Sequence, residues 1–161
     1  ECSVCNVSGW THYNMYENKD NLTFASMFVN ANHELFQERF PEVVKNKIIY
    51  FVGHKEADIT KLPFEVERHF KVGTNAWLND LDILDEIREV YLANENAIFL
   101  FACGPLSNYL ITELWREKQN NTLLDIGSAF DLEIYGNWTR SFHIKKGGYG
   151  KTCEWIGNKN L

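Results

Sequence analysis

Two apolar segments that each end in a glycine, with one amphipathic segment between them, constrain the fold more than any other feature. "NAIFLFACG" (96–104) ends in Gly104, and "NNTLLDIG" (120–127) ends in Gly127. Pro105 suits the first turn of a helix, and apolar residues then recur at helical spacing at Leu106, Tyr109, Leu110 and Leu114. A strand, a helix and a strand at this spacing form a βαβ unit with parallel strands. We therefore predict an α/β, Rossmann-like fold, in which a mainly parallel sheet is flanked by helices in a single domain.

The preceding segments extend the same architecture. "KIIYFVG" (47–53) is a short apolar run closed by glycine, as expected for a strand buried on both faces, and "HFKVGTN" (69–75) is a weaker second strand. Helical spacing of apolar residues predicts one helix over 21–39, with its end marked by Pro41, and a second over 80–92. The stripe on the helix after Pro105 also predicts that Trp115 lies in the core.

Composition limits the function classes. A length of 161 residues fits one domain, 1–161, in which the motif-bearing core is 48–136 and the segments 1–20 and 143–161 are peripheral or flexible. A net charge of -6 argues against nucleic acid as a partner. The chain has neither an apolar run long enough to cross a bilayer nor a signal-peptide pattern, so we expect no membrane span and a soluble, cytoplasmic protein. Because the first residue is Glu rather than Met, we also expect other domains of a longer chain as partners.

One candidate site lies where the strand over 96–104 ends. Ligands of parallel sheets bind at the carboxyl ends of the strands, where helix amino termini converge. Gly104 allows a tight turn, and Ser107 and Asn108 stand in the first helical turn beside unpaired N–H groups. The turn suits a phosphate, although a strand, Gly, Pro and helix in succession are equally a plain structural junction.

The second candidate site is "TLLDIGSAFDLEIYG" (122–136), which contains three acids. Asp125 ends the strand, and apolar residues then alternate with Asp131 and Glu133. Alternation predicts an extended segment on which Asp131 and Glu133 project from the same face, whereas on a helix they would point about 200° apart. Two adjacent carboxylates are a reasonable site for Mg²⁺ or Mn²⁺. The alternative is an edge strand with one face in water.

Part of this segment, "LLDIGSAFD", resembles the first motif of S-adenosylmethionine-dependent methyltransferases. That motif normally opens the sheet, whereas about 34 residues remain after Gly127, which is too few for the further strands of a doubly wound domain. "SAFD" also lacks the Gly-x-Gly ending. Methyl transfer therefore stays a minor alternative.

The order of the motifs points to another family. "KIIYFVG", "FKVGTNAW", "FLFACGPLSNYL" and "DIGSAFDLEIYG" resemble, in sequence order, the motifs of the bacterial GT-D class of glycosyltransferases. The matching positions are an Asn-Ala pair, a Gly-Pro turn, an Asp-Ile-Gly strand end and a D-x-E motif: Asn75, Ala76, Gly104, Pro105, Asp125, Ile126, Gly127, Asp131 and Glu133. The resemblance covers about 90 residues, which is most of one domain.

The resemblance implies a metal-dependent glycosyltransferase that moves a sugar from a nucleoside diphosphate sugar, commonly a UDP-sugar, to a glycan or glycoprotein acceptor. Asp131 and Glu133 would hold the metal, Mn²⁺ or Mg²⁺, and the donor would contact Asn75, Gly104, Pro105, Ser107 and Asn108. Asp125 is the candidate catalytic residue, as a base, as a ligand of a hydroxyl group or as a residue that orients a metal-bound water. A non-catalytic nucleotide-binding or sugar-binding module of a larger protein is the alternative.

Three further groups of residues are open to two interpretations. His143 is a candidate base or an ordinary surface residue, and Lys145, Lys146 and Lys151 either close over a bound diphosphate or stay in a solvated loop. Trp77 suits either the core or stacking on a sugar.

Overall fold

The computed structural model describes residues 33–137 and 139. The chain divides into two compact units, one made of Glu1–Arg39 with Trp138–Leu161 and the other of Phe40–Asn137. Every strand in the described residues belongs to the second unit. The terminal segments 1–20 and 143–161, with His143 and the three lysines that follow it, lie outside the described residues. That the whole chain forms one domain stays a prediction.

Four parallel strands form the sheet of the second unit. They are β1 (Ile49–His54), β2 (Arg68–Val72), β3 (Ile98–Ala102) and β4 (Thr122–Asp125), in the order β2-β1-β3-β4. The chain therefore moves outward from β1 to β2 and then returns past β1 to add β3 and β4 on the other side. The predicted α/β, Rossmann-like class, with a parallel sheet flanked by helices, is confirmed for the described residues.

The two central strands are buried on both faces. Every residue of β1 except His54, and every residue of β3 except Ala102, is buried. This matches the continuous apolar runs of the sequence, because a parallel strand between helical layers has no wet face. Packing also explains why position 53 is glycine, because a Cβ there would overlap the ring of Phe51.

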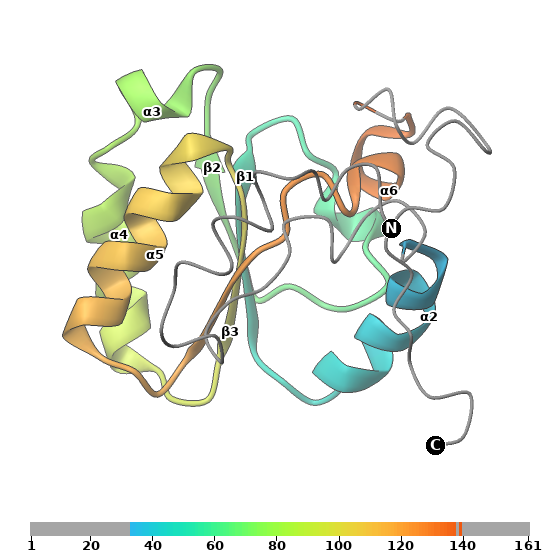
Figure 1. Ribbon diagram of the computed structural model, residues 1–161, viewed down its shortest axis with the longest axis horizontal. Coiled ribbons are helices and arrows are strands. Elements are labelled where there is room, and N and C mark those ends of the chain that lie inside the picture. Colours follow the sequence, from blue (N-terminus) through green and yellow to red (C-terminus); the bar gives the residue numbers. More distant parts are fainter. Residues whose placement is uncertain (1–32, 138, 140–161) are drawn as a thin grey trace, which may run out of the picture. The chain divides into compact units, whose positions relative to one another are not determined.

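Helices cover each face of the sheet (Figure 1). On one face lie α4 (Ile83–Ala93) and α5 (Pro105–Glu117). Their buried residues form one core with those of β1, β2 and β3. The short α3 (Ala76–Asn79) lies at the end of this helical layer. The predicted stripe on α5 is confirmed, because Leu106, Leu110 and Leu114 are fully buried, but the core position predicted for Trp115 is wrong. No helix in the described residues is long and apolar enough to cross a membrane.

On the other face lie η2 (Ile59–Lys61) and α6 (Asp131–Tyr135), which contact each other, and α2 (His33–Val44) contributes residues 40–44 to this unit. In the second unit, the ring of Phe40 packs against the rings of Phe64 and Phe130, with ring centroids 5.6 Å and 5.8 Å away. The prediction that Pro41 ends the first helix is wrong, because α2 continues through Pro41 to Val44. Burial of Phe40 and Val44 on either side of the proline offsets the hydrogen bond that proline removes.

The extended segment predicted over Asp131 and Glu133 is also wrong, because these residues form α6. Phe130 and Ile134, four residues apart, are both buried, whereas Leu132 between them is exposed. That spacing is helical rather than alternating. Gly136, with a φ of 71°, closes the helix as its N–H donates to the carbonyl of Leu132.

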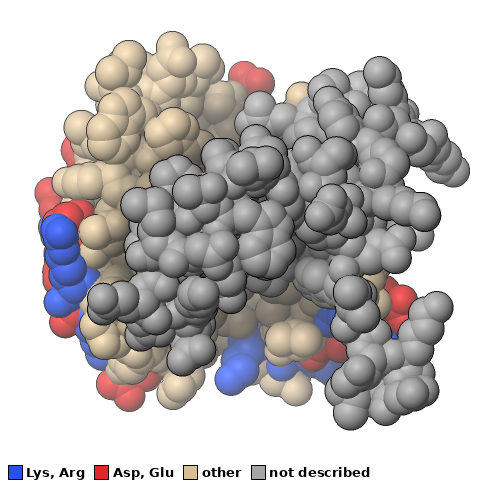
Figure 2. Space-filling view, viewed as in Figure 1, with Lys and Arg blue, Asp and Glu red and all other residues tan. Residues whose placement is uncertain are grey.

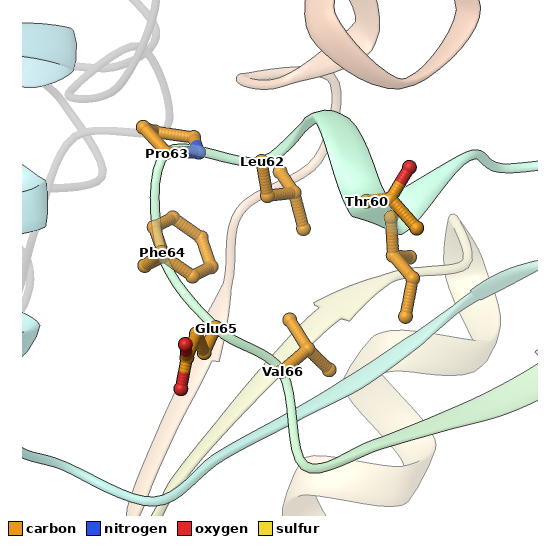
Figure 3. Close-up of a pocket in the computed structure, with 7 residues that line it drawn as sticks. Thr60, Leu62, Pro63, Phe64, Glu65 and Val66 are labelled. Carbon is orange, nitrogen blue, oxygen red and sulfur yellow. The ribbon is translucent and has the colours of Figure 1, made fainter.

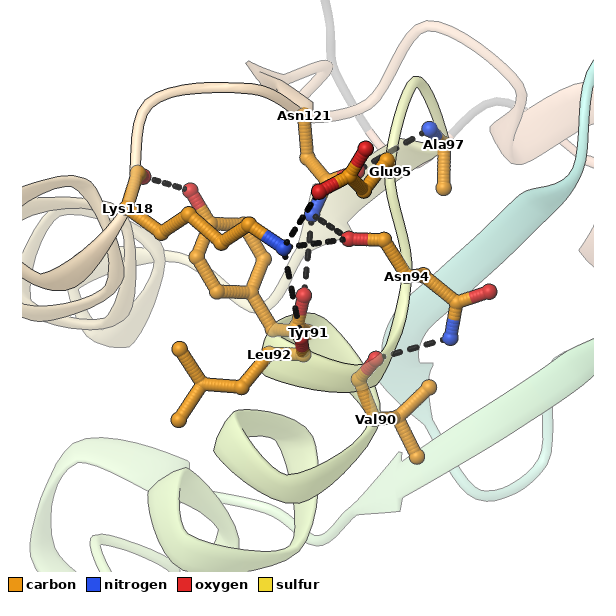
Figure 4. Close-up of polar contacts among 8 residues, drawn as sticks. All are labelled: Val90, Tyr91, Leu92, Asn94, Glu95, Ala97, Lys118 and Asn121. Atoms are coloured by element: carbon orange, nitrogen blue, oxygen red, sulfur yellow. Dashed lines mark hydrogen bonds and ion pairs between the residues drawn. The ribbon is translucent and has the colours of Figure 1, made fainter.

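A buried amide ties the amino ends of the strands to α4 (Figure 4). Asn121 donates from Nδ2 to the carbonyls of Tyr91 and Asn94, at 2.9 Å and 3.0 Å, and its Oδ1 accepts the N–H of Ala97 at 3.0 Å. The hydroxyl of Tyr91 donates to the carbonyl of Lys118. One side chain thus pairs three backbone groups that the turn into β3 leaves open.

Replacing Asn121 by alanine should therefore cost about 1–3 kcal/mol of unfolding free energy, because buried backbone groups lose their partners. Urea unfolding followed by circular dichroism measures this cost. Gln119→Ala, at an exposed position two residues away, is the matched control and should change stability by less than about 0.5 kcal/mol. Equal stabilities of the two variants would contradict the role of the buried amide.

Candidate functional site

A pocket of about 650 Å³ opens at the carboxyl ends of β1, β2 and β3. The strand order reverses direction between β1 and β3, which is the position where open α/β sheets bind ligands. Its lining comes from the last residues of these three strands and from the turns that lead into α3 and α5. The pocket thus lies where the fold alone predicts a binding site.

Three of the predicted site residues line this pocket: Asn75, Gly104 and Pro105. Asn75 precedes α3 in the left-handed conformation, with a φ of 57°, which asparagine tolerates better than most residues. Gly104 also has a positive φ, 62°, and it lets β3 turn directly into α5 with Pro105 as the first helical residue. The structure therefore brings together two motifs that are about 30 residues apart in the sequence.

The wall of the pocket between β1 and β2 holds two polar side chains that the sequence analysis did not select. Nε2 of His54, the last residue of β1, lies 3.4 Å from Oγ1 of Thr74, which follows β2. Nδ1 of the same ring accepts the N–H of Glu56 at 3.3 Å. These two contacts fix the ring at the pocket. The only signal in the sequence was position, since both residues stand where a predicted strand ends.

Cys103 and Ser107 form the floor of the turn into α5. The Oγ of Ser107 donates or accepts at 3.2 Å with Sγ of Cys103 and accepts the N–H of Cys103 at 3.3 Å. Burial, reinforced by the charge of Asp125, raises the pKa of the Cys103 thiol to about 11. The thiol is therefore protonated at neutral pH and is not a nucleophile. Ser107 is fully buried, so it supports the turn instead of reaching a ligand directly.

Asn108 and Asp125 lie next to the pocket without lining it. Asn108 is exposed in the first turn of α5, where its carbonyl accepts the hydroxyl of Thr112. Asp125 ends β4 beside Phe101 of β3, and its Oδ1 accepts the N–H of Gly127 at 3.0 Å. Partial burial raises the pKa of the Asp125 carboxyl above its ordinary value, against the opposing effect of the Gly127 hydrogen bond. Because Phe101 directly precedes the pocket-lining Ala102, Asp125 lies at the same edge of the sheet as the pocket.

The D-x-E residues do not form the predicted carboxylate pair. On α6, Asp131 and Glu133 are two residues apart and so point about 200° away from each other. Asp131 shares a helical face with Tyr135, whose pKa is raised by burial and then by the charges of Asp131 and Glu56. Glu133 stands apart with a buried Oε2 that has no hydrogen-bond partner among the described residues. One orphaned oxygen is compatible with a cation, but the pair does not fit a shared ion.

The described residues contain no group of three or more His, Cys, Asp and Glu side chains that could hold a metal. The D-x-E segment also lies on the face of η2, whereas α3 and α5 lie with the other helical layer (Figure 1). Of the four motifs, the Asn-Ala pair, the Gly-Pro turn and the Asp-Ile-Gly strand end meet at the carboxyl edge, whereas the D-x-E motif lies on α6 beside η2, in the other helical layer, and does not line the pocket.

A second pocket, of about 520 Å³, lies under the loop between η2 and β2 (Figure 3). All of its lining residues come from one stretch of the chain, 59–66, in which only Lys61 does not line the pocket. They include the apolar residues Leu62, Phe64 and Val66. None of the predicted site residues lines it. Because one loop supplies the lining, no set of chemical groups from different elements converges there.

The chain matches no protein family, no curated protein and no solved structure.

The raised pKa of Asp125 makes a prediction about stability. A carboxyl group whose pKa is higher in the folded protein than in the unfolded chain destabilises the fold at pH values above both pKa values and not below them. Asp125→Asn keeps an acceptor for the Gly127 N–H and removes the charge. The variant should melt at a higher temperature than the parent at pH 7, with a gap that closes as pH falls below the ordinary value of 3.8. Scanning calorimetry between pH 3 and 8 measures the gap, and a lower melting temperature of the variant at pH 7 would contradict the assignment.

Proposed function

We propose that this chain binds a nucleoside diphosphate sugar at the carboxyl edge of its sheet and transfers the sugar to a glycan or glycoprotein acceptor. The observation that carries the proposal is that two motifs of the GT-D resemblance, the Asn-Ala pair and the Gly-Pro turn, line one pocket at the point where the strand order reverses. The Asp-Ile-Gly strand end lies at the same edge of the sheet. A UDP-sugar donor, a cytoplasmic setting and the absence of nucleic acid as a partner belong to the same proposal. Other domains of a longer chain stay proposed partners.

The first turn of α5 suits the diphosphate. This turn is the positive end of the α5 helix dipole, and it lies beside Gly104, which lets a ligand approach the backbone. Pro105 has no N–H and the Ser107 N–H donates to the carbonyl of Gly104 at 3.0 Å, so the dipole supplies most of the attraction. When the bond between the sugar and the diphosphate breaks, negative charge builds up on the leaving phosphate oxygen. A positive helix end stabilises that charge more than it stabilises the intact donor.

Asp125 suits the proton transfer. The acceptor hydroxyl must lose a proton as it attacks the anomeric carbon, and a carboxylate with a raised pKa holds a proton better than an ordinary one. The Gly127 N–H fixes one carboxylate oxygen and leaves the other available to the acceptor. Asp125 therefore acts as the base, and the hydrogen bond from the Gly127 N–H, which follows β4, keeps its carboxylate in place.

A divalent ion would stabilise the charge of a leaving diphosphate when it is bound. Asp131 and Glu133 do not present a common face for it, so no step is assigned to an ion there. Mn²⁺ or Mg²⁺ stays a prediction of the resemblance, and the experiment tests it separately.

A non-catalytic nucleotide-binding or sugar-binding module is the second candidate. The specific observation in its favour is the separation of Asp131 from Glu133 on α6, because the resemblance depends on that motif for metal-assisted transfer. This candidate keeps the same pocket and the same ligand. It differs only in predicting no turnover.

Turnover of a panel of nucleoside diphosphate sugars, with and without Mn²⁺, decides between the two. If Asp125 is the base, Asp125→Asn should lower kcat about a hundredfold or more and change the donor Kd by less than about twofold. Glu89→Gln, an exposed acid on α4, is the matched control and should match the parent.

Donor binding without release of sugar under any condition would favour the binding module. Failure of every donor to bind, with or without Mn²⁺, would overturn both candidates. A parent-like kcat for Asp125→Asn would remove the base assignment and leave the donor site standing.

A further inference from the structure

The carboxyl-edge pocket has one wall made by an exposed indole. Trp77 lines the pocket from α3, and 46% of its surface is exposed. Its ring meets the ring of Tyr109 edge to face, with centroids 5.8 Å apart and an interplanar angle of 82°. Tyr109 belongs to α5, so the contact links the two turns that border the pocket. The indole is thus held by Tyr109 while nearly half of its surface stays open to a ligand.

The short α3 that carries Trp77 is fixed at both ends. Ala76 is buried in the core, and the carboxylate of Asp80 accepts the N–H of Gly73 at 3.0 Å. Nδ2 of Asn79 donates to the carbonyl of Thr74 at 3.2 Å. A large apolar side chain on a four-residue helix is therefore presented by a local network that does not depend on burying that side chain.

The charge of the pocket selects the part of a ligand that fits. No Lys, Arg, Asp or Glu is among its lining residues, and the only titratable side chains there are those of His54 and Cys103. The surface over α3 is mainly uncharged as well (Figure 2), with Leu78 and Leu81 also exposed. An uncharged, mostly apolar pocket suits a neutral planar ring better than a diphosphate, whose charges need pairing.

Asn75 supplies the polar group that such a ring would need. The side-chain amide of Asn75 is exposed at the pocket and makes no hydrogen bond to any of the described residues. An amide offers a donor and an acceptor together, which is the pattern that the edge of a nucleobase pairs with. Its left-handed backbone conformation sets where the amide projects.

We propose that the pocket binds the nucleobase of the donor, stacked on Trp77 with its polar edge read by the amide of Asn75. The inference rests on the proposed function only in taking a nucleotide as the ligand. It places the base on the β2 side of the point where the strand order reverses, and it leaves the diphosphate to the turn into α5 at the end of β3. The base, rather than the sugar, thereby accounts for the aromatic wall.

Calorimetric titration with UMP, CMP, AMP and GMP tests the base, and ribose 5-phosphate and glucose 1-phosphate serve as probes without a base. Trp77→Ala should weaken nucleoside monophosphates about tenfold to a hundredfold and leave the two base-free probes unchanged, whereas Trp77→Phe should keep most of the affinity. Trp115→Ala is the matched control, because Trp115 is 47% exposed on α5 and does not line the pocket.

Asn75→Gly removes the amide and keeps the left-handed backbone. It should change the order of preference among the four bases, whereas Trp77→Ala should weaken all four in similar proportion. Asn96→Gly, at another exposed left-handed asparagine that precedes the amino end of β3 and does not line the pocket, is its control and should leave the preference intact.

The outcomes separate this inference from the proposed function. Base binding that depends on Trp77, in a protein that turns over no donor, would support the inference and count against glycosyl transfer. Turnover of a donor, together with parent-like affinity of Trp77→Ala for the nucleoside monophosphates, would support glycosyl transfer and overturn the inference. A loss on Trp77→Ala that appears with glucose 1-phosphate and not with the nucleoside monophosphates would assign the indole to the sugar and overturn the inference.

Discussion

Burial of β1 and β3 on both faces is the constraint on which the rest of this structure depends. Phe51, Val52, Phe99, Leu100 and Phe101 are fully buried, and each such side chain contributes roughly 1.5–3 kcal/mol when it leaves water. Both faces must therefore be covered, and the segments that cover them connect one strand to the next in the same direction, so the strands are parallel. Parallel strands end at one edge, so the turns after β1, β2 and β3 meet there and form the pocket. The site is a consequence of how the core is covered.

The same packing explains why the acids of the last motif separate. Asp125 sits at the end of β4 and shares the edge of the sheet with the pocket. Five residues later the chain has crossed to the other helical layer, where burial of Phe130 and Ile134 winds α6 and turns Asp131 away from Glu133. Packing of two apolar side chains thus decides the direction of two carboxylates. A motif read as a metal pair is, in this structure, part of a helix that covers the sheet.

The strands and the long helices could be predicted from the sequence because their signals are local and strong. Continuous apolar runs predicted β1 and β3, and the stripe of leucines predicted α5. Residues at strand ends were predictable in the same way, which is why Asn75, Gly104 and Asp125 fall at the expected edge. His54 was not selected as a site residue, and Trp77 was left open between the core and stacking on a sugar, because only the arrangement of three strands brings them to one pocket. The helical form of 131–135 was missed because a five-residue segment fits alternation and helical spacing about equally well.

The central claim is that a nucleotide sugar binds at the carboxyl edge of this sheet. Mapping backbone amide shifts by nuclear magnetic resonance during titration with a UDP-sugar and Mn²⁺ tests it most directly. The account predicts that the shifts concentrate at residues 73–78, before and within α3, and at 103–108, around the turn into α5. Shifts that concentrate at 131–135 and leave those two segments unchanged would contradict it.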